Sequence, residues 1–337
     1  MTVSFRKRPY RLGKLLTSLG SIDRENNEGV WERSLGEQAA KFYGQHLIQG
    51  GQLENSSFIP TRSMVRDLLS GTASAGGDLV ATSLETAADS VRPVTVLETA
   101  GAERLEVSGD NVVLPRFAPA DAGWVAENAA YTALTTTTTS VDSTPKLAAA
   151  RLSFSRRLKL LGNDIEAAVV AEVGRAVGAV IEQGAIAGSG SSNQPLGLLN
   201  LPGKLTETFS AATPTSDELA SMLEKLGDAD IDISRVHFLL HPSTAADLMK
   251  SRVDANSGAL VLSDLKIHGL PVHISTNVTE DKVIALDPSF VRIVYFGAPQ
   301  IVVDPFRGGI SGTTHVQVLN AMDLAVTHQS AICVGSA

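Results

Sequence analysis

The chain has 337 residues, of which 43% are hydrophobic and 19% are charged, and this composition predicts one or two folded domains with a sizeable core. The single cysteine, Cys333, excludes an intrachain disulfide, and no apolar run approaches the roughly 20 residues needed to span a bilayer. Glycine is frequent, and aromatic residues make up only 5% of the chain. This mixture suits turns and close-packed small side chains better than an aromatic-lined ligand pocket.

Charge is distributed unevenly along the chain. The net charge is −8, yet the first 20 residues carry five basic side chains and no acidic one, which leaves −13 on the remainder. The basic residues are Arg6, Lys7, Arg8, Arg11 and Lys14. A basic arm on an acidic body is typical of a segment that meets a polyanion or an acidic neighbour, and a solvated tail is the alternative.

Residues 1–75 are predicted to form an arm. Residues 29–49 have apolar side chains at helical spacing, and a second short helix is predicted over 61–69. Glycines at 50 and 51 separate the two helices.

Residues 80–160 have a β pattern. Strands are predicted at 91–97, 111–115 and 147–155, and the sequence between Val113 and Ser153 is rich in threonine and poor in large apolar residues. A two-stranded excursion with so little apolar content cannot bury a core of its own. Arms of about 12 residues would reach on the order of 40 Å, so we expect the excursion to lie on a neighbouring copy.

The helix predicted over 164–187 is the clearest element. An apolar stripe recurs at three- and four-residue steps, and Gly188 follows the last turn. The stripe contains Ile165, Val169, Val173, Val177, Val180, Ile181 and Gly184.

The remainder of the chain mixes helices and strands without strict alternation, which predicts an α+β class. Helices are expected at 216–226 and 242–250. Strands are expected at 236–240, 272–275, 283–286, 291–296, 301–303, 316–319 and 324–328.

No catalytic, cofactor or metal site emerges from the motifs. The glycine-rich stretch 188–193 follows a helix, whereas a phosphate loop precedes one, and it lacks the Gly-Lys-Ser/Thr sequence. His237 and His241 bracket a strand end, His268 and His273 flank a turn, and no cysteine or glutamate completes a zinc set. The chain is therefore predicted to be a non-enzyme without a cofactor.

Several side chains are candidates for contacts between subunits. Trp124 stands in an otherwise polar stretch, where it anchors either an interface or the base of the arm. A basic cluster at the junction between excursion and helix would meet carboxylates of an adjacent subunit, such as Glu127. The cluster consists of Arg151, Arg156, Arg157 and Lys159.

The order and spacing of several short motifs resemble the major capsid proteins of tailed phages, which have the Hong Kong 97-type fold. The resemblance covers residue 76 to the C-terminus and rests on the set rather than on any single motif. The motifs are Gly76-Gly77-Asp78-Leu79-Val80, Gly123 to Asn128, the threonines 135–139, Pro145-Lys146, Ser155 to Leu158, the long helix, and Gln194 to Leu199.

The resemblance implies an α+β phage major capsid fold with an N-terminal arm, an extended β-loop, a long spine helix, a peripheral domain and an axial domain. The implied divisions are an arm (1–75), a first part of the peripheral domain (76–111), the extended β-loop (112–155), the peripheral domain with its spine helix (156–230), the axial domain (231–297) and the closing strands of the peripheral domain (298–337). Some relatives cross-link a loop lysine to an asparagine; this chain has Asn128 to Tyr131 where that lysine would lie and Thr314 near the asparagine position, so no cross-link is expected.

The implied function is self-assembly into pentamers and hexamers of an icosahedral shell around double-stranded DNA. The implied partners are copies of the chain, packaged DNA, and scaffolding, portal and decoration proteins, without a membrane. The shell would be part of a virion assembled in the cytoplasm of a bacterial host. An encapsulin-like compartment shell is the alternative within the fold, and a phage-encoded hydrolase is the alternative of another class.

Overall fold

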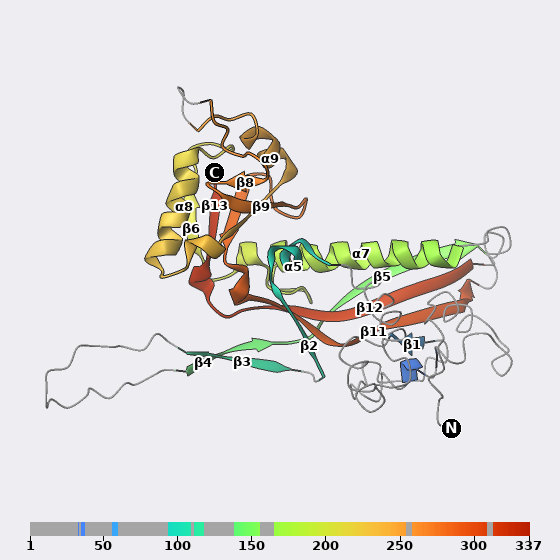
Figure 1. The fold of residues 1–337 in the computed structure, drawn as a ribbon. Helices are drawn as coiled ribbons and strands as arrows, with labels where there is room; N and C mark the ends of the chain where they lie inside the picture. The colour runs from blue at the N-terminus through green and yellow to red at the C-terminus, as the bar shows by residue number, and fades with distance from the viewer. Residues whose placement is uncertain are drawn as a thin grey trace, which may run out of the picture.

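The computed structural model describes residues 33, 35–37, 56–59, 94–108, 111–117, 138–155, 165–253, 258–308 and 313–337. These residues form two β-sheets, a long helix and a two-stranded ribbon (Figure 1). The mixture of elements confirms the expected α+β class. Of the two helices expected in the arm, the first is described only at 33 and 35–37, where the residues are helical, and the second lies outside the described residues.

The first sheet is built on two long antiparallel strands, β11 and β12. Its order is β1-β11-β12-β5, and β2 runs parallel to β11 beside residues 292–296, whereas β1 pairs with residues 300–302. The strands are β1 (Ser56–Phe58), β2 (Glu103–Val107), β5 (Lys146–Ser155), β11 (Val291–Gly308) and β12 (Thr313–Val326).

The four short strands predicted over 291–328 are wrong in number, because they merge into these two long strands. The Gly297–Pro299 interruption, which the sequence presents as a strand break, is a bulge: the register shifts between Phe296 and Gln300 and the ladder then continues. Gly297 takes a φ of 66°, which a residue with a side chain rarely adopts.

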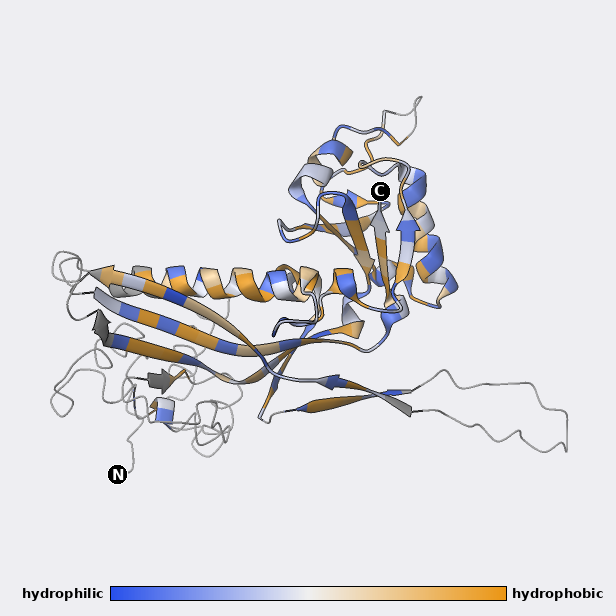
Figure 2. Ribbon diagram, turned by 180° about the vertical axis from the view of Figure 1, so that it is seen from behind, coloured by the Kyte–Doolittle hydropathy of each residue, from blue (hydrophilic) through white to orange (hydrophobic). Residues whose placement is uncertain are grey.

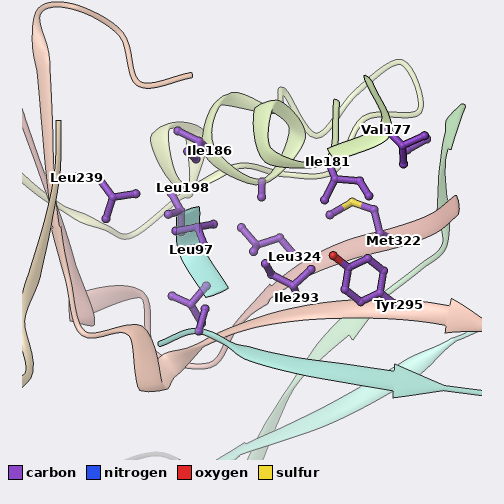
Figure 3. Close-up of a cluster of buried hydrophobic side chains, with 14 of the residues drawn as sticks. Leu97, Val177, Ile181, Ile186, Leu198, Leu239, Ile293, Tyr295, Met322 and Leu324 are labelled. Carbon is purple, nitrogen blue, oxygen red and sulfur yellow. The ribbon is translucent and has the colours of Figure 1, made fainter. Parts of the chain in front are cut away.

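The helix α7 (Ile165–Ala187) lies along one face of this sheet (Figure 2). Val169, Val173, Val177 and Ile181 are buried against β5, β11 and β12, which confirms the expected stripe. Figure 3 shows Val177 and Ile181 close to Tyr295 and Met322 of the strands. Val180 departs from the expectation, because it is 44% exposed on the outer side of the helix.

The strand predicted at 91–97 is wrong where the structure describes it, because residues 96–100 form the short helix α5 (Val96–Ala100). Thr95 accepts a hydrogen bond from the Glu98 amide, and the Glu98 carboxylate accepts one from the Thr95 amide. This reciprocal capping box is a stronger local signal than the apolar alternation of the segment.

The second sheet has six strands in the order β6-β13-β10-β7-β9-β8. Its strands are β6 (Leu205–Thr208), β7 (His237–Leu240), β8 (Lys266–Ile267), β9 (Leu270–Ile274), β10 (Lys282–Leu286) and β13 (Ile332–Ser336). The helices α8 (Ser216–Asp228) and α9 (Pro242–Leu248) and the 3-10 turns η1 (Leu198–Asn200), η2 (Ile233–Arg235), η3 (Pro288–Phe290) and η4 (Gln329–Ala331) complete this part of the chain.

The two faces of the second sheet belong to different hydrophobic clusters. Phe238 and Leu240 pack with α8 and α9, whereas Leu239 and Ile284 join the cluster that also contains the α7 stripe. The two sheets are therefore held together through one shared core (Figure 3).

The second sheet gathers more of the chain than the expected axial segment 231–297. The elements β6 and α8 precede residue 231, and β13 follows residue 297, yet all three belong to this sheet or its core. The strand β13 is an internal strand, which pairs with β6 on one side and with β10 on the other.

The excursion expected over 112–155 is shorter than predicted. Strand β3 (Val112–Phe117) pairs with β4 (Thr138–Ser143), and these two form a separate ribbon. Strand β5, which was expected to be the return arm, pairs instead with β12 in the first sheet. The reason is its inward face, where Ala148 is buried and Leu152 and Phe154 pack against the core.

Candidate assembly surfaces

The ribbon of β3 and β4 extends away from the two sheets (Figures 1 and 2). Its register runs from Val112 opposite Ser143 to Phe117 opposite Thr138. Val112, Leu114 and Val141 pack against the small cluster on the outer face of the first sheet. Beyond this root the side chains of β4 are polar, whereas β3 carries the exposed Val113.

A buried carboxylate fixes the root of the ribbon. Asp323 of β12 accepts a hydrogen bond from the Ser143 hydroxyl at 3.0 Å and another from the Thr144 amide at 2.9 Å. Both side chains are buried, with 1% of Ser143 and 8% of Asp323 exposed. Charge-assisted hydrogen bonds between buried groups therefore fix the direction in which the ribbon leaves the first sheet.

The outer face of β5 is exposed and carries one of the predicted interface residues. Arg151 lies there beside Leu147, which is 54% exposed, and Ala149. The other predicted interface residues and the basic arm lie outside the described residues: Trp124, Glu127, Arg156, Arg157 and Lys159 in the first group, and Arg6, Lys7, Arg8, Arg11 and Lys14 in the second.

Leu147 also lines a shallow groove of about 120 Å³ between the start of β5, the second half of α7 and the turn after it. Val180 and Gly184 line it from the helix, and Asn193 and Pro195 line it from the turn. The groove offers apolar side chains and amide groups, and no set of residues suited to acid–base or nucleophilic chemistry.

The turn at the edge of this groove is the glycine-rich stretch 188–193. It folds back on itself, because the Gly190 amide donates to the Pro195 carbonyl at 3.0 Å and the Gly197 amide donates to the Gly188 carbonyl at 2.9 Å. A Cβ on Gly188 would come within 2.2 Å of that Pro195 carbonyl oxygen. The glycine thus serves a close approach of two backbone segments at the end of α7.

A second exposed apolar surface, which the sequence analysis missed, lies between α9 and β8. Met249, Val253, Leu260 and Leu265 each expose large apolar side chains there. The available signal was the presence of these residues in a segment otherwise rich in serine, aspartate and glycine. This surface is at the end of the second sheet farthest from the ribbon (Figure 1).

The described residues contain no group of three or more histidine, cysteine or acidic side chains that could hold a metal ion. Burial raises the pKa of the Cys333 thiol to about 11, which keeps it protonated and weakly nucleophilic near neutral pH. In the part of the chain that the structure covers, no helix is long and apolar enough to cross a membrane.

Comparisons with known proteins agree with this geometry. The model of the phage capsid family matches residues 76–337. The chain is 24% identical over 317 residues to the major capsid protein of Halomonas phage phiHAP-1, and the match covers 93% of this chain and 50% of that protein. The chain thus spans about half the length of this curated relative.

Solved capsid structures share the fold at low sequence identity. The capsid of a native GTA particle superposes with a TM-score of 0.60 at 18% identity, over 72% of this chain and 90% of that one. Microbacterium phage Oxtober96 gives a TM-score of 0.59 at 15% identity, over 72% and 90%. A virus-like particle from Pyrococcus furiosus gives 0.53 at 15% identity, over 74% and 97%.

Since the family model covers most of the chain, this protein belongs to the phage capsid family and has the Hong Kong 97-type capsid fold.

Proposed function

We propose that this chain is the structural subunit of a phage shell, which assembles into pentamers and hexamers around double-stranded DNA. The shell is the wall of a virion and forms in the cytoplasm of the bacterial host. Copies of the same chain are its principal partners, and scaffolding, portal and decoration proteins are the further partners.

The projecting ribbon is the observation that supports self-assembly most strongly. Val113 on β3 is 57% exposed, and among the described residues the ribbon packs against its own subunit at the root. An isolated two-stranded ribbon is marginally stable in water, so a second surface has to cover it. A neighbouring copy supplies such a surface at every position of a closed shell.

The exposed apolar segment between α9 and β8 is the second proposed contact. Side chains such as Met249 and Leu265 are too exposed to belong to the subunit's own core. A ring of copies would bring these surfaces together around its axis. Arg151 on β5, together with the predicted residues around Trp124 and Arg156, remains a candidate for the contacts between rings.

The test removes the residues that connect the two strands of the ribbon. Residues 118–137 are replaced by Asn-Gly, because these two residues close an antiparallel pair with a tight turn and Phe117 already pairs with Thr138. We expect a folded subunit that forms no closed shells. Electron microscopy and sedimentation measure the shells, and a thermal melt with circular dichroism measures the fold.

Two results with this variant would contradict the proposed role of the removed residues. If the shortened chain is unfolded, residues 118–137 belong to the subunit's core and do not serve assembly. If it forms shells of normal stability, neighbouring copies do not depend on residues 118–137. A strictly monomeric wild-type chain at high concentration would contradict the proposed function itself.

Substitution of the basic residues near the N-terminus tests the proposed contact with DNA. Replacing Arg6, Lys7, Arg8, Arg11 and Lys14 by glutamine removes five positive charges, which on DNA would neutralise phosphates through counterion release. If the arm contacts DNA, empty shells keep their stability while filled shells hold less DNA or open earlier. If the arm binds neighbouring subunits, empty shells weaken as well and become sensitive to salt. Unchanged empty and filled shells would contradict both roles.

An encapsulin-like compartment is the second candidate, and the Pyrococcus furiosus particle gives it some support through the shared fold. That particle superposes less closely than the GTA capsid, with TM-scores of 0.53 and 0.60. The contents of purified particles distinguish the two functions, since a virion holds DNA and a compartment holds cargo protein.

A further inference from the structure

Two histidines of the second sheet share a hydrogen bond. The Nδ1 atom of His237, at the start of β7, lies 3.0 Å from the Nε2 atom of His273 on β9. Their ring planes differ by only 4° and the ring centroids are 5.2 Å apart. This separation equals the nitrogen–nitrogen distance plus the two ring radii, so the rings meet edge to edge in nearly one plane.

This geometry decides how many protons the pair can hold. When both rings are neutral, one nitrogen donates and the other accepts. One added proton converts the contact into a charge-assisted hydrogen bond between an imidazolium and an imidazole. Two added protons place two N–H groups against each other at 3.0 Å and remove the only acceptor, so the contact cannot survive.

The pair is located where the second sheet is held by few contacts. Strand β9 pairs with β7 over only three residues, from Phe238 opposite Val272 to Leu240 opposite Ile274. In the described part of the sheet, β9 is followed by the edge strand β8, which has two residues and pairs with β9. The histidine contact therefore reinforces the junction that joins the β8–β9 hairpin to the rest of the sheet.

The same hairpin is tied to the long helix. Directly after β9, the Ser275 hydroxyl and the Asn277 amide group both donate to the Glu182 carboxylate of α7. The Glu182 carboxylate also accepts from the Val96 amide at the start of α5, at 3.4 Å. Loss of the β7–β9 junction would free the segment that carries these donors.

Among the described residues, the charged groups near the pair include one buried carboxylate. Asp287, which follows β10, is buried and accepts hydrogen bonds from Ser289, while Arg235 of η2 lies 3.9 Å from its carboxylate. The elements packed against β9 contribute Glu98 of α5, whose carboxylate is bound by the Thr95 amide, Glu182 of α7 and the exposed Lys266 of β8.

Burial dominates the protonation of both rings. Burial lowers the pKa of His237, although the Asp287 carboxylate acts in the opposite direction. Burial also lowers the pKa of His273, and the neighbouring His237 lowers it further. A solvated histidine has a pKa of about 6.5. An opened hairpin therefore takes up more protons below this pH than the closed one, and acid favours opening.

We propose that the His237–His273 pair is an acid-sensitive latch, which holds the β8–β9 hairpin against β7 at neutral pH and releases it, together with its link to α7, when both rings are protonated. The proposal concerns the subunit itself and does not depend on shell formation.

Hydrogen exchange measured on the full chain tests the latch. The Ser275 amide donates to the Leu240 carbonyl across the β7–β9 junction, so its exchange reports opening, whereas the Val272 amide donates to the Leu265 carbonyl within the hairpin and is an internal control. After correction for intrinsic rates, we expect the protection of the Ser275 amide to fall about tenfold or more for each pH unit below 6.5, since opening takes up at least one proton. Amides of the central strand β10 should keep their protection.

The matched variants separate the pair from other histidines. The double substitution His237→Gln and His273→Gln leaves an amide contact that cannot titrate, and protection should become independent of pH. His268 lies in the same hairpin at a φ of 51° and donates to the Ser216 carbonyl, a bond that protonation does not remove. His268→Asn tolerates that backbone and should retain the wild-type pH dependence.

Two results overturn the proposal: wild-type protection that does not change between pH 7.5 and 5.0, or a double variant with the wild-type dependence. If the double variant does not fold, exchange at the C2–H position of each histidine in the wild-type chain supplies the second measurement. Two coupled steps with at least one well below pH 6.5 support the latch, whereas two independent titrations near 6.5 contradict it.

Discussion

Strands β4 and β5 are consecutive and are joined only by Thr144 and Pro145, yet β5 belongs to the first sheet and β4 to the projecting ribbon. Strand β5 places Ala148, Leu152 and Phe154 on the core and pairs with β12 along its whole length. In β4 the only large apolar side chain is Val141, and the strand leaves the body with β3. The difference shows that the inward side chains of a strand, and not its β propensity, decide whether it joins a sheet or projects from it.

Neighbouring stretches of the sequence therefore have different roles, one in folding and one in contacts between subunits. Substitutions on the β5 and α7 side should act on the folding of the subunit. Substitutions on the ribbon side should act on the contact between subunits and leave the fold intact. Asp323 lies at the point where the two regions part, so its substitution should affect both.

The largest effect is expected in the shared core. Val173→Asp places a carboxylate where the side chain is 2% exposed, and an unpaired buried charge costs more than about 4 kcal/mol. We expect insoluble or unfolded protein, measured by circular dichroism and soluble yield. Ala179→Asp, on the exposed side of the same helix, is the control and should fold. A soluble Val173→Asp chain with unchanged thermal stability would falsify the assignment of this stripe to the core.

A smaller effect is expected at the root of the ribbon. Asp323→Ala leaves the Ser143 hydroxyl and the Thr144 amide without their acceptor, at a cost of about 2 to 4 kcal/mol. The subunit should fold with a lower melting temperature and assemble poorly, because the ribbon loses its fixed direction. Ser143→Ala removes one donor together with its need for a partner and should cost less. Equal shell yields for Asp323→Ala and wild type would show that the direction of the ribbon is set elsewhere.

The smallest effect is expected at the cap of α8, far from both regions. Hydrogen bonds from the Thr215 amide, and then from Ser210, lower the pKa of Glu218 from 4.5 to about 2. The resulting stability is present above pH 4.5 and is lost as the pH falls from there through 2. Because the group is largely solvated, Glu218→Gln should cost under about 1 kcal/mol at pH 7.

Thermal melts between pH 7 and 3 measure this contribution of Glu218. The difference in melting temperature between wild type and Glu218→Gln should decrease as the solution becomes acidic. Glu224→Gln, on the exposed face of the same helix, is the control and should show no such gap. A gap that widens with acid would mean that Glu218 is not held as a carboxylate by the cap.

The sequence by itself determined the elements whose stabilising interactions are local or periodic. The apolar stripe of α7 recurs at helical spacing, and α8 and α9 begin at a capping threonine and at a proline, so each could be located before the structure was seen. The Thr95–Glu98 capping box is also a local signal, and it outweighs the apolar alternation that predicts a strand over the same residues. The scarcity of large apolar residues between Val113 and Ser153 predicted a two-stranded excursion, and the structure shows a shorter one, formed by β3 and β4 without β5.

Only the tertiary structure decided which residues distant in sequence become neighbours. The pairing of β5 with β12 joins residues more than 150 positions apart, and the bulge at Gly297 joins two predicted strands into one. The contact of His237 with His273 likewise depends on which strands become neighbours. Local patterns carry no information on such neighbours, because the free energy of a strand pair resides in the side chains and hydrogen bonds of the partner.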